Sequence, residues 1–152
     1  MSGSDLENLQ AIDTAAIFER AAARAREHGL RYAGALTPAE AWDLVQAGEA
    51  NLVDVRTAFE LATVGRIEGV PLVEWPRDGD DEAIDRFVHD LRATVDRAKP
   101  VLFICRSGVR SHYASHVASA VGYERAYNVL EGFEGHPGMG DGWRAAGLPW
   151  TR

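Results

Sequence analysis

One segment of the chain joins the pattern of a buried strand to the only cysteine of the protein. Residues 101–104 are Val-Leu-Phe-Ile, and a run of four apolar residues, two of them β-branched, is typical of a short buried strand. Cys105 follows directly, so its thiol is expected at the exit of that strand. After a short loop, Ser111 is predicted to cap a helix over 112–121. The loop is therefore expected to direct several backbone N–H groups and a helix N-terminus at one sulfur atom.

The composition of this loop favours an ionised thiol. Backbone N–H groups, the positive end of a helix dipole and the guanidinium groups of Arg106 and Arg110 all stabilise an anion. We therefore expect Cys105 to ionise more readily than a free cysteine and to act as a nucleophile in a partly exposed electropositive cup. The alternative is that Cys105 packs as a small hydrophobe. Its neighbours Arg106, Ser107, Gly108 and Arg110 are poor core residues, which argues against that alternative.

The sequence Cys-Arg-Ser-Gly-Val-Arg-Ser at 105–111 resembles the active loop of the rhodanese family. Rhodanese domains transfer sulfane sulfur through a persulfide on the loop cysteine. Cysteine phosphatases and related arsenate reductases place one residue more between cysteine and arginine than the four, 106–109, that stand here. By this resemblance, the shorter loop makes a cradle sized for a sulfur on sulfur and too tight for a full tetrahedral oxyanion.

The resemblance also implies which residues make the site. Cys105 would be the catalytic residue. The residues expected to bind substrate and persulfide are those of the loop, Arg106, Ser107, Gly108, Val109 and Arg110. Their N–H groups would hold the negative charge, and the two arginines would attract a dianionic donor. The residues expected in supporting roles are Asp54, Arg56 and Ser111.

A second stretch carries the resemblance further. Asp54-Val55-Arg56 and Glu60 follow a predicted buried strand and match the family's second motif. We expect these charges to be structural, with the aspartate fixing loop backbone or pairing with an arginine. Residues 65–70, Gly-Arg-Ile-Glu-Gly-Val, resemble the family's Gly-His-Ile-Pro-Gly-Ala. Arg66 stands in for the histidine and Glu68 for the proline, so the local loop shape is expected to differ.

Strands alternate with helices along the chain, which predicts an α/β domain with a mostly parallel sheet and helices on both faces. The resemblance covers about 36–150 and implies a five-stranded rhodanese-like sheet of the single-domain type. We expect 1–35 to form an N-terminal helical extension and 36–152 to form the rhodanese-like domain. The further predicted strands are 32–35, 51–55, 70–74 and 126–130, and the further predicted helices are 13–28, 37–47, 58–62 and 81–97.

Three segments have open roles. The helix over 13–28 precedes the resemblance and is expected to be a clasp on the domain, a homodimer contact or a partner-docking helix. Trp75 follows a predicted strand and either walls the Cys105 pocket or packs ordinarily. The glycine-rich stretch 135–142 is either a flap near the active loop or a plain surface loop. It lacks the lysine of a phosphate-binding loop, so it does not indicate a nucleotide site.

Charge and cysteine content exclude several classes of partner. The net charge of −7 and the pI near 5.2 argue against nucleic acid or an anionic membrane. A single cysteine excludes an internal disulfide, so sulfur on Cys105 must pass to an outside acceptor. Residues 1–10 lack the pattern of a signal peptide, and we expect a cytoplasmic protein. His112 and His116 have no supporting ligands for a metal site, so no metal and no cofactor are expected.

These observations lead to one expected function and its alternatives. The resemblance implies a thiosulfate sulfurtransferase that moves sulfane sulfur from a small donor to a thiol or cyanide acceptor, or to a protein thiol, through a Cys105 persulfide. The alternatives are a non-catalytic adaptor or sulfur-sensing module and, with weaker support, a cysteine phosphatase or arsenate reductase.

Overall fold

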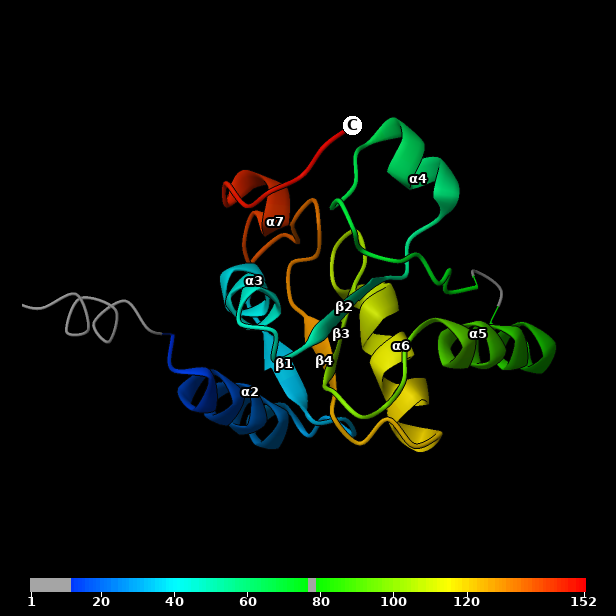
Figure 1. Cartoon of the computed structure of the whole chain (residues 1–152), viewed down its shortest axis with the longest axis horizontal. Helices are drawn as coiled ribbons and strands as arrows, with labels where there is room; N and C mark the ends of the chain where they lie inside the picture. The colour runs from blue at the N-terminus through cyan, green and yellow to red at the C-terminus, as the bar shows by residue number, and fades with distance from the viewer. Residues whose placement is uncertain (1–11, 77–78) are drawn as a thin grey trace, which may run out of the picture.

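The protein folds around one sheet of four parallel strands (Figure 1). The computed structural model describes residues 12–76 and 79–152, so the expectation for residues 1–10 lies outside the described part. The sheet order is β1-β4-β3-β2. The strands are β1 (Gly34–Leu36), β2 (Asn51–Asp54), β3 (Val101–Ile104) and β4 (Ala126–Val129). The helices are α2 (Thr14–His28), α3 (Pro38–Gln46), α4 (Ala58–Thr63), α5 (Asp81–Thr94), α6 (Val109–Ala120) and α7 (Gly142–Ala145).

Helices cover both faces of the sheet, as predicted, because side chains alternate along each buried strand. Leu102 and Ile104 of β3 pack into a core with residues of α2, α3 and α7. Val101, Phe103 and Cys105 point to the other face, into a core with residues of α5 and α6. The cysteine side chain therefore belongs to the α5 and α6 side of the sheet.

The prediction of five strands is wrong by one strand in the described residues. The segment predicted as a strand at 70–74 runs beside β2 but makes only one parallel bridge, between Leu72 and Asp54. The Asp54 N–H donates to the Pro71 carbonyl, and the Val73 N–H donates to the Asp54 carbonyl. Pro71 has no N–H of its own, so the ladder cannot extend through it as a regular strand.

Most element boundaries follow the chemistry of their caps. Thr37 and Glu40 form the reciprocal capping box that the sequence predicts at the start of α3. Gly29 ends α2 in a left-handed conformation, with φ of 62°. The predicted helix 81–97 instead ends at Thr94, because Val95 is extended and its N–H closes the last turn on the Leu91 carbonyl.

The helix after the cysteine loop begins earlier than predicted. Gly108 is the N-cap of α6 with φ of 99°, a conformation that glycine adopts without strain, and the helix starts at Val109. The prediction that Ser111 caps a helix over 112–121 is therefore wrong. Ser111 lies inside the first turns of α6 and is fully buried, which frees its hydroxyl for contacts with the site.

Helix α2 packs on the domain as a clasp. Its buried residues Ile17 and Ala21 belong to the same core as the sheet, and a Cβ at Gly34 of β1 would lie 2.5 Å from the Ala21 carbonyl oxygen. Arg24 Nη1 donates to Glu40 Oε1 of α3 at 2.6 Å. Burial opposes ionisation of Glu40, but hydrogen bonds from Arg24, the Thr37 N–H and Arg20 outweigh it and lower the pKa to about 2.

The described helices include none with the length and apolar character that a membrane crossing requires.

Candidate active site

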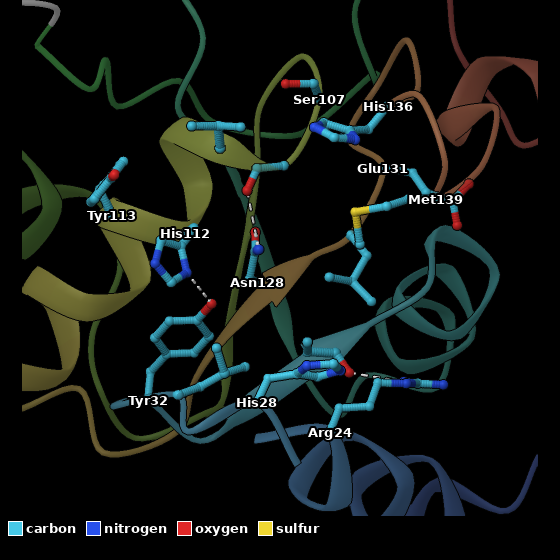
Figure 2. Close-up of a pocket in the computed structure, with 15 residues that line it drawn as sticks. Arg24, His28, Tyr32, Ser107, His112, Tyr113, Asn128, Glu131, His136 and Met139 are labelled. Atoms are coloured by element: carbon cyan, nitrogen blue, oxygen red, sulfur yellow. Dashed lines mark hydrogen bonds between the residues drawn. The ribbon is translucent and has the colours of Figure 1, made fainter. Parts of the chain in front are cut away.

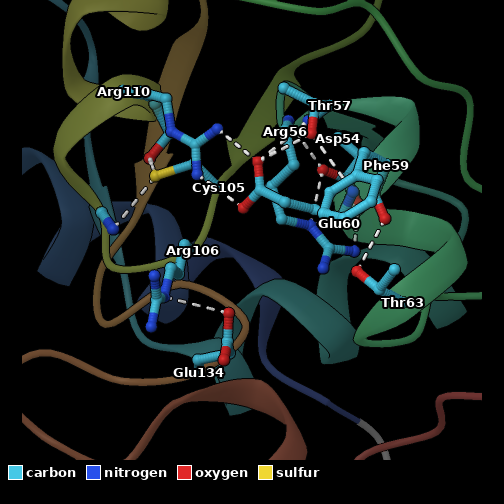
Figure 3. Close-up of polar contacts among 12 residues, drawn as sticks. Asp54, Arg56, Thr57, Phe59, Glu60, Thr63, Cys105, Arg106, Arg110 and Glu134 are labelled. Atoms are coloured by element: carbon cyan, nitrogen blue, oxygen red, sulfur yellow. Dashed lines mark hydrogen bonds and ion pairs between the residues drawn. The ribbon is translucent and has the colours of Figure 1, made fainter.

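The thiol of Cys105 lies where β3 ends and the loop to α6 begins (Figure 3). The Gly108 N–H donates a hydrogen bond to Cys105 Sγ at 3.1 Å, so the loop folds back over the sulfur. Of the loop amides at 106–110, all within the described part, this is the one that bonds to Sγ. A backbone donor at this position can stabilise negative charge on the sulfur.

The expectation of a partly exposed cysteine is wrong. Only 1% of Cys105 is exposed, and the residue packs with Val55, Phe103 and Ala114. The side chain follows the alternation of β3 into the α5 and α6 core, while the loop covers it from above. The thiol therefore combines an apolar setting with a polar contact to the loop that covers it.

Ser111 and Asn128 form a hydrogen-bond chain that ends at the sulfur. Ser111 Oγ lies 3.3 Å from Cys105 Sγ and donates to Asn128 Oδ1 at 2.5 Å. Asn128 Nδ2 donates to the Gly108 carbonyl at 3.1 Å, which fixes the amide with its oxygen toward Ser111. Because the single proton of Ser111 is given to Asn128, the neutral thiol is the donor to Ser111 Oγ. Asn128 on β4 thus holds both the loop and the hydroxyl beside the sulfur.

Loss of this asparagine is expected to lower stability. In an Asn128→Ala variant, the buried Ser111 hydroxyl and the Gly108 carbonyl lose their partner, which costs about 1–3 kcal/mol of unfolding free energy. Urea denaturation followed by circular dichroism measures the loss. Ser119→Ala, at a half-buried position near the end of α6, serves as the matched control. Equal unfolding free energies for the two variants would contradict the role of Asn128.

Arg110 does not project freely toward solvent, because Glu60 of α4 binds it (Figure 3). Arg110 Nη1 and Nη2 donate to the two Glu60 carboxylate oxygens at 2.7 and 2.8 Å. The Thr57 N–H also donates to Glu60, which closes the capping box of α4. The hydrogen bonds from Arg110 are the main cause that lowers the pKa of Glu60 to about 2, against the effect of burial. The pair links the second motif to the cysteine loop.

This carboxylate gives the protein an acid-dependent stability. The pKa of Glu60 falls from an ordinary value of 4.5 to about 2 on folding, so the ionised group stabilises the folded state above pH 4.5. That contribution is lost as the pH falls from 4.5 toward 2. We expect the unfolding free energy of wild-type protein to fall more steeply over this range than that of Glu60→Gln. Urea denaturation at each pH measures both slopes, Glu74→Gln is the exposed control, and parallel slopes would contradict the prediction.

Arg106 is the more exposed of the two loop arginines. Its Nε lies 3.1 Å from Glu134 Oε2, and its side chain is 65% exposed. Both guanidinium groups of the loop therefore have carboxylate partners. The loop is less electropositive than its sequence alone indicates, and Arg106 is the arginine that an incoming anion can reach.

Asp54 and Arg56 form a buried ion pair, as one of the expectations for the second motif has it. Arg56 Nη2 donates to Asp54 Oδ2 at 2.7 Å, and the two side chains are 0% and 2% exposed. Asp54 Oδ1 also accepts the Arg56 N–H, and Arg56 Nη2 donates to the Gly65 carbonyl. The guanidinium carbon lies 4.2 Å from the centre of the Phe133 ring. The pair fixes the exit of β2, next to the exit of β3.

The turn after β4 supports the cysteine loop from behind. The Phe133 N–H donates to the Cys105 carbonyl at 2.8 Å, and the Glu134 N–H donates to the Arg106 carbonyl at 2.9 Å. Between these contacts, a Cβ at Gly132 would lie 2.5 Å from the Arg106 carbonyl, so only glycine fits. The turn and the loop therefore hold each other in one arrangement.

Two hollows flank the loop. One, of about 280 Å³, is lined by Ser107 and Gly108 of the loop and by His136 and Met139 of the glycine-rich stretch (Figure 2). That stretch therefore lies beside the loop, as the flap hypothesis requires. The other hollow, of about 470 Å³, is lined by Arg110 and by Trp75. Trp75 also packs edge-to-face on Phe87 of α5, with ring centres 5.0 Å apart.

Sequence reasoning missed several contacts of the site. It did not single out Asn128, Glu134 or Tyr32, because each meets the loop or α6 only through the fold. Tyr32 Oη lies 2.6 Å from His112 Nδ1. This hydrogen bond occupies one ring nitrogen of His112, for which the sequence predicts no metal-binding role. Burial is the main cause that raises the pKa of Tyr32 to about 12, while burial followed by the charge of His116 lowers the pKa of His112.

The site therefore defines a class of α/β protein in which a cysteine ends a parallel strand and is held by the short loop that leads into the next helix. The sequence profile of the Rhodanese-like domain matches residues 37–136. The chain therefore belongs to the rhodanese-like family, and this confirms the resemblance seen in the sequence.

Individual relatives agree with this assignment. The chain is 31% identical over 114 residues to thiosulfate sulfurtransferase GlpE of Actinobacillus succinogenes, covering 75% of this chain and 86% of that protein. It is 34% identical over 112 residues to the uncharacterized protein RC0915 of Rickettsia conorii, covering 70% and 87%. The crystal structure of Rv0390 from M. tuberculosis superposes with a TM-score of 0.68 at 45% identity, covering 79% of this chain and 98% of that one.

Proposed function

We propose that this protein is a sulfurtransferase that passes sulfane sulfur from thiosulfate or a similar small donor to a thiol or cyanide acceptor, through a persulfide on Cys105. The observation that carries the proposal is the hydrogen bond from the Gly108 N–H to Cys105 Sγ at 3.1 Å, at the end of a parallel strand. A relative named thiosulfate sulfurtransferase, at 31% identity, supports the reaction class.

The proposed donor step balances without an outside oxidant. The Cys105 thiolate attacks the outer sulfur of thiosulfate and forms a new S–S bond. The S–S bond of thiosulfate breaks, and sulfite leaves with its electron pair. The loop amides, with that of Gly108 foremost, stabilise the negative persulfide. Arg106, exposed beside Glu134, is the guanidinium that meets the incoming dianion.

The remaining residues have positioning roles in this proposal. Arg110 is held by Glu60 and fixes the far end of the loop. Ser111 accepts the hydrogen bond of the resting thiol, and the buried pair of Asp54 and Arg56 secures the neighbouring strand exit. Ser107 and Val109 contribute backbone to the cradle.

The spacing of the loop separates this reaction from phosphate chemistry. Four residues stand between Cys105 and Arg110, and Arg110 is engaged by a carboxylate rather than open to a tetrahedral anion. We therefore expect no hydrolysis of phosphate esters by the same preparation.

Intact-mass measurement tests the proposal. Wild-type protein incubated with thiosulfate is expected to gain the mass of one sulfur atom and to release it as thiocyanate when cyanide is added. Protein that gains no sulfur from thiosulfate, mercaptopyruvate or a persulfidated donor would contradict a transferase. Binding of a partner protein that survives loss of Cys105 would then favour an adaptor.

A further inference from the structure

The pocket of about 280 Å³ lies on the same face of the sheet as the reactive sulfur. Ala35 of β1 pairs with Asn128 of β4, and both line the pocket, as does Leu130 two residues further on. Asn128 shares the face of Ala126, which packs in the same core as Cys105. The pocket therefore occupies the part of this face between α6 and the end of α2 (Figure 2).

One residue of the active loop, Gly108, lies between this pocket and the sulfur. Gly108 lines the pocket, and its N–H lies 3.1 Å from Cys105 Sγ. Ser107 and Val109 line the pocket beside it. Cys105 is only 1% exposed, and this pocket borders the loop that covers its sulfur.

Several of the polar groups of the wall already have partners. Arg24 is bound to Glu40, and Tyr32 to His112. The Glu131 carboxylate accepts the N–H of Gly142. A dianion placed here would lose water without gaining an unengaged cation from these groups, which is costly.

Most of the surface of the wall is apolar, and it suits an uncharged body. The other polar side chains of the wall are His28, Ser107, Tyr113 and His136. Its apolar side chains are Leu30, Ala35, Val109, Leu130 and Met139. The volume of about 280 Å³ lies just below the range of about 300–1,000 Å³ found for small-molecule pockets, so the occupant is small. One aromatic ring or a branched alkyl group fits this description.

The structure assigns this pocket to the sulfur acceptor, which we infer to be a small organic thiol with an aromatic or branched apolar body. The inference rests on the proposed function and adds the class of acceptor to it. The acceptor thiolate attacks the outer sulfur of the Cys105 persulfide and forms a new S–S bond. The bond from that sulfur to Cys105 Sγ breaks, and its electron pair returns to Sγ as thiolate.

Two of the pocket's walls come from segments outside the cysteine loop. Arg24 and His28 belong to α2, which precedes the matched family segment at 37–136. Met139 lies beyond the end of that segment, on the glycine-rich stretch 135–142. These segments therefore shape the acceptor's body, while the loop provides the chemistry.

The rates at which different acceptors remove the sulfur test the inference. Protein first loaded with sulfur from thiosulfate is discharged with cyanide, with 2-mercaptoethanol or with phenylmethanethiol. We expect the second-order rate constant for phenylmethanethiol to exceed that for 2-mercaptoethanol by about tenfold, once each is corrected for its thiolate fraction. Equal corrected rates would overturn the inference.

Narrowing the pocket gives the decisive comparison. In Leu130→Trp, the preference for phenylmethanethiol is expected to fall toward onefold, while discharge by cyanide stays within about twofold of wild type. Met139→Ala changes a half-exposed side chain and should lower the preference even if Leu130→Trp does not fold. Ala93→Leu, in a hollow between α5 and the segment 72–76, is the matched control and should keep the preference. A preference unchanged in both pocket variants would overturn the inference.

A binding measurement separates this inference from the proposed function. Phenylmethanol cannot accept sulfur, and its binding is expected to shift the NMR signal of the Met139 methyl group. If thiosulfate adds no sulfur but the signal shifts and the shift is lost in Leu130→Trp, the transferase proposal fails while the apolar site stands. If sulfur is added but phenylmethanol leaves the signal unchanged, the transferase stands and the assignment of the pocket fails.

Discussion

A Cys105→Ser variant is expected to take up no sulfur from thiosulfate and to form thiocyanate only at the uncatalysed rate. The serine hydroxyl is nearly the same size as the thiol, but it does not ionise near neutral pH and cannot carry a persulfide. Gly108 and Ser111 can still bond to the oxygen, so the fold is expected to persist. Intact mass after incubation with thiosulfate, together with a colorimetric thiocyanate assay, measures both effects.

A displaced thiol provides the control for this result. The double variant Cys105→Ser, Ser119→Cys keeps one cysteine but moves it to a half-buried position further along α6. We expect this protein to gain no sulfur that cyanide removes as thiocyanate, because its thiol is not held by the loop. Uptake equal to that of wild type would show that the loop contributes nothing, and residual uptake by Cys105→Ser alone would place the acceptor atom elsewhere.

The central part of the fold could be predicted because its signals are local. The apolar run 101–104, the lone cysteine and the following small residues specify a strand, a loop and a helix within one stretch of chain. The capping box at Thr37 and Glu40 is equally local and is found as predicted. The prediction of a fifth strand at 70–74 was wrong because of one residue, Pro71. Pro71 has no N–H to donate to β2, so the segment does not form a regular strand although most of its residues are apolar.

The contacts that shape the site depend on residues far apart in the chain. Glu60 and Arg110 are 50 positions apart, and Ser111 and Asn128 are 17 positions apart. A sequence shows that such residues can form hydrogen bonds, but the strand order β1-β4-β3-β2 decides which of them meet. The exposure of Cys105 was mispredicted for a related reason: the alternation of β3 and the fold of the loop at Gly108 together bury it.

Removal of Arg56 is expected to destabilise the protein more than any change on its surface. In Arg56→Ala, the Asp54 carboxylate remains buried without its cation, which costs about 3–5 kcal/mol of unfolding free energy. Arg20→Ala removes a guanidinium that is 54% exposed in its pair with Glu40, and such exposed pairs contribute about 1 kcal/mol or less. Urea denaturation of both variants gives the comparison, and similar losses would contradict the importance of burial.

The same variant separates structural support from chemistry. Within the described part of the chain, the hydrogen bonds of the Arg56 side chain go to Asp54 and to the Gly65 carbonyl, and none goes to Cys105 or its loop. If its role is to fix the exit of β2, each folded molecule of Arg56→Ala should still accept one sulfur from thiosulfate at low temperature, where the folded state remains populated. A loss of sulfur uptake in molecules shown by circular dichroism to be folded would mean that the ion pair also sets the geometry around the sulfur. The route would be Phe133, because the Arg56 guanidinium covers its ring and its N–H donates to the Cys105 carbonyl.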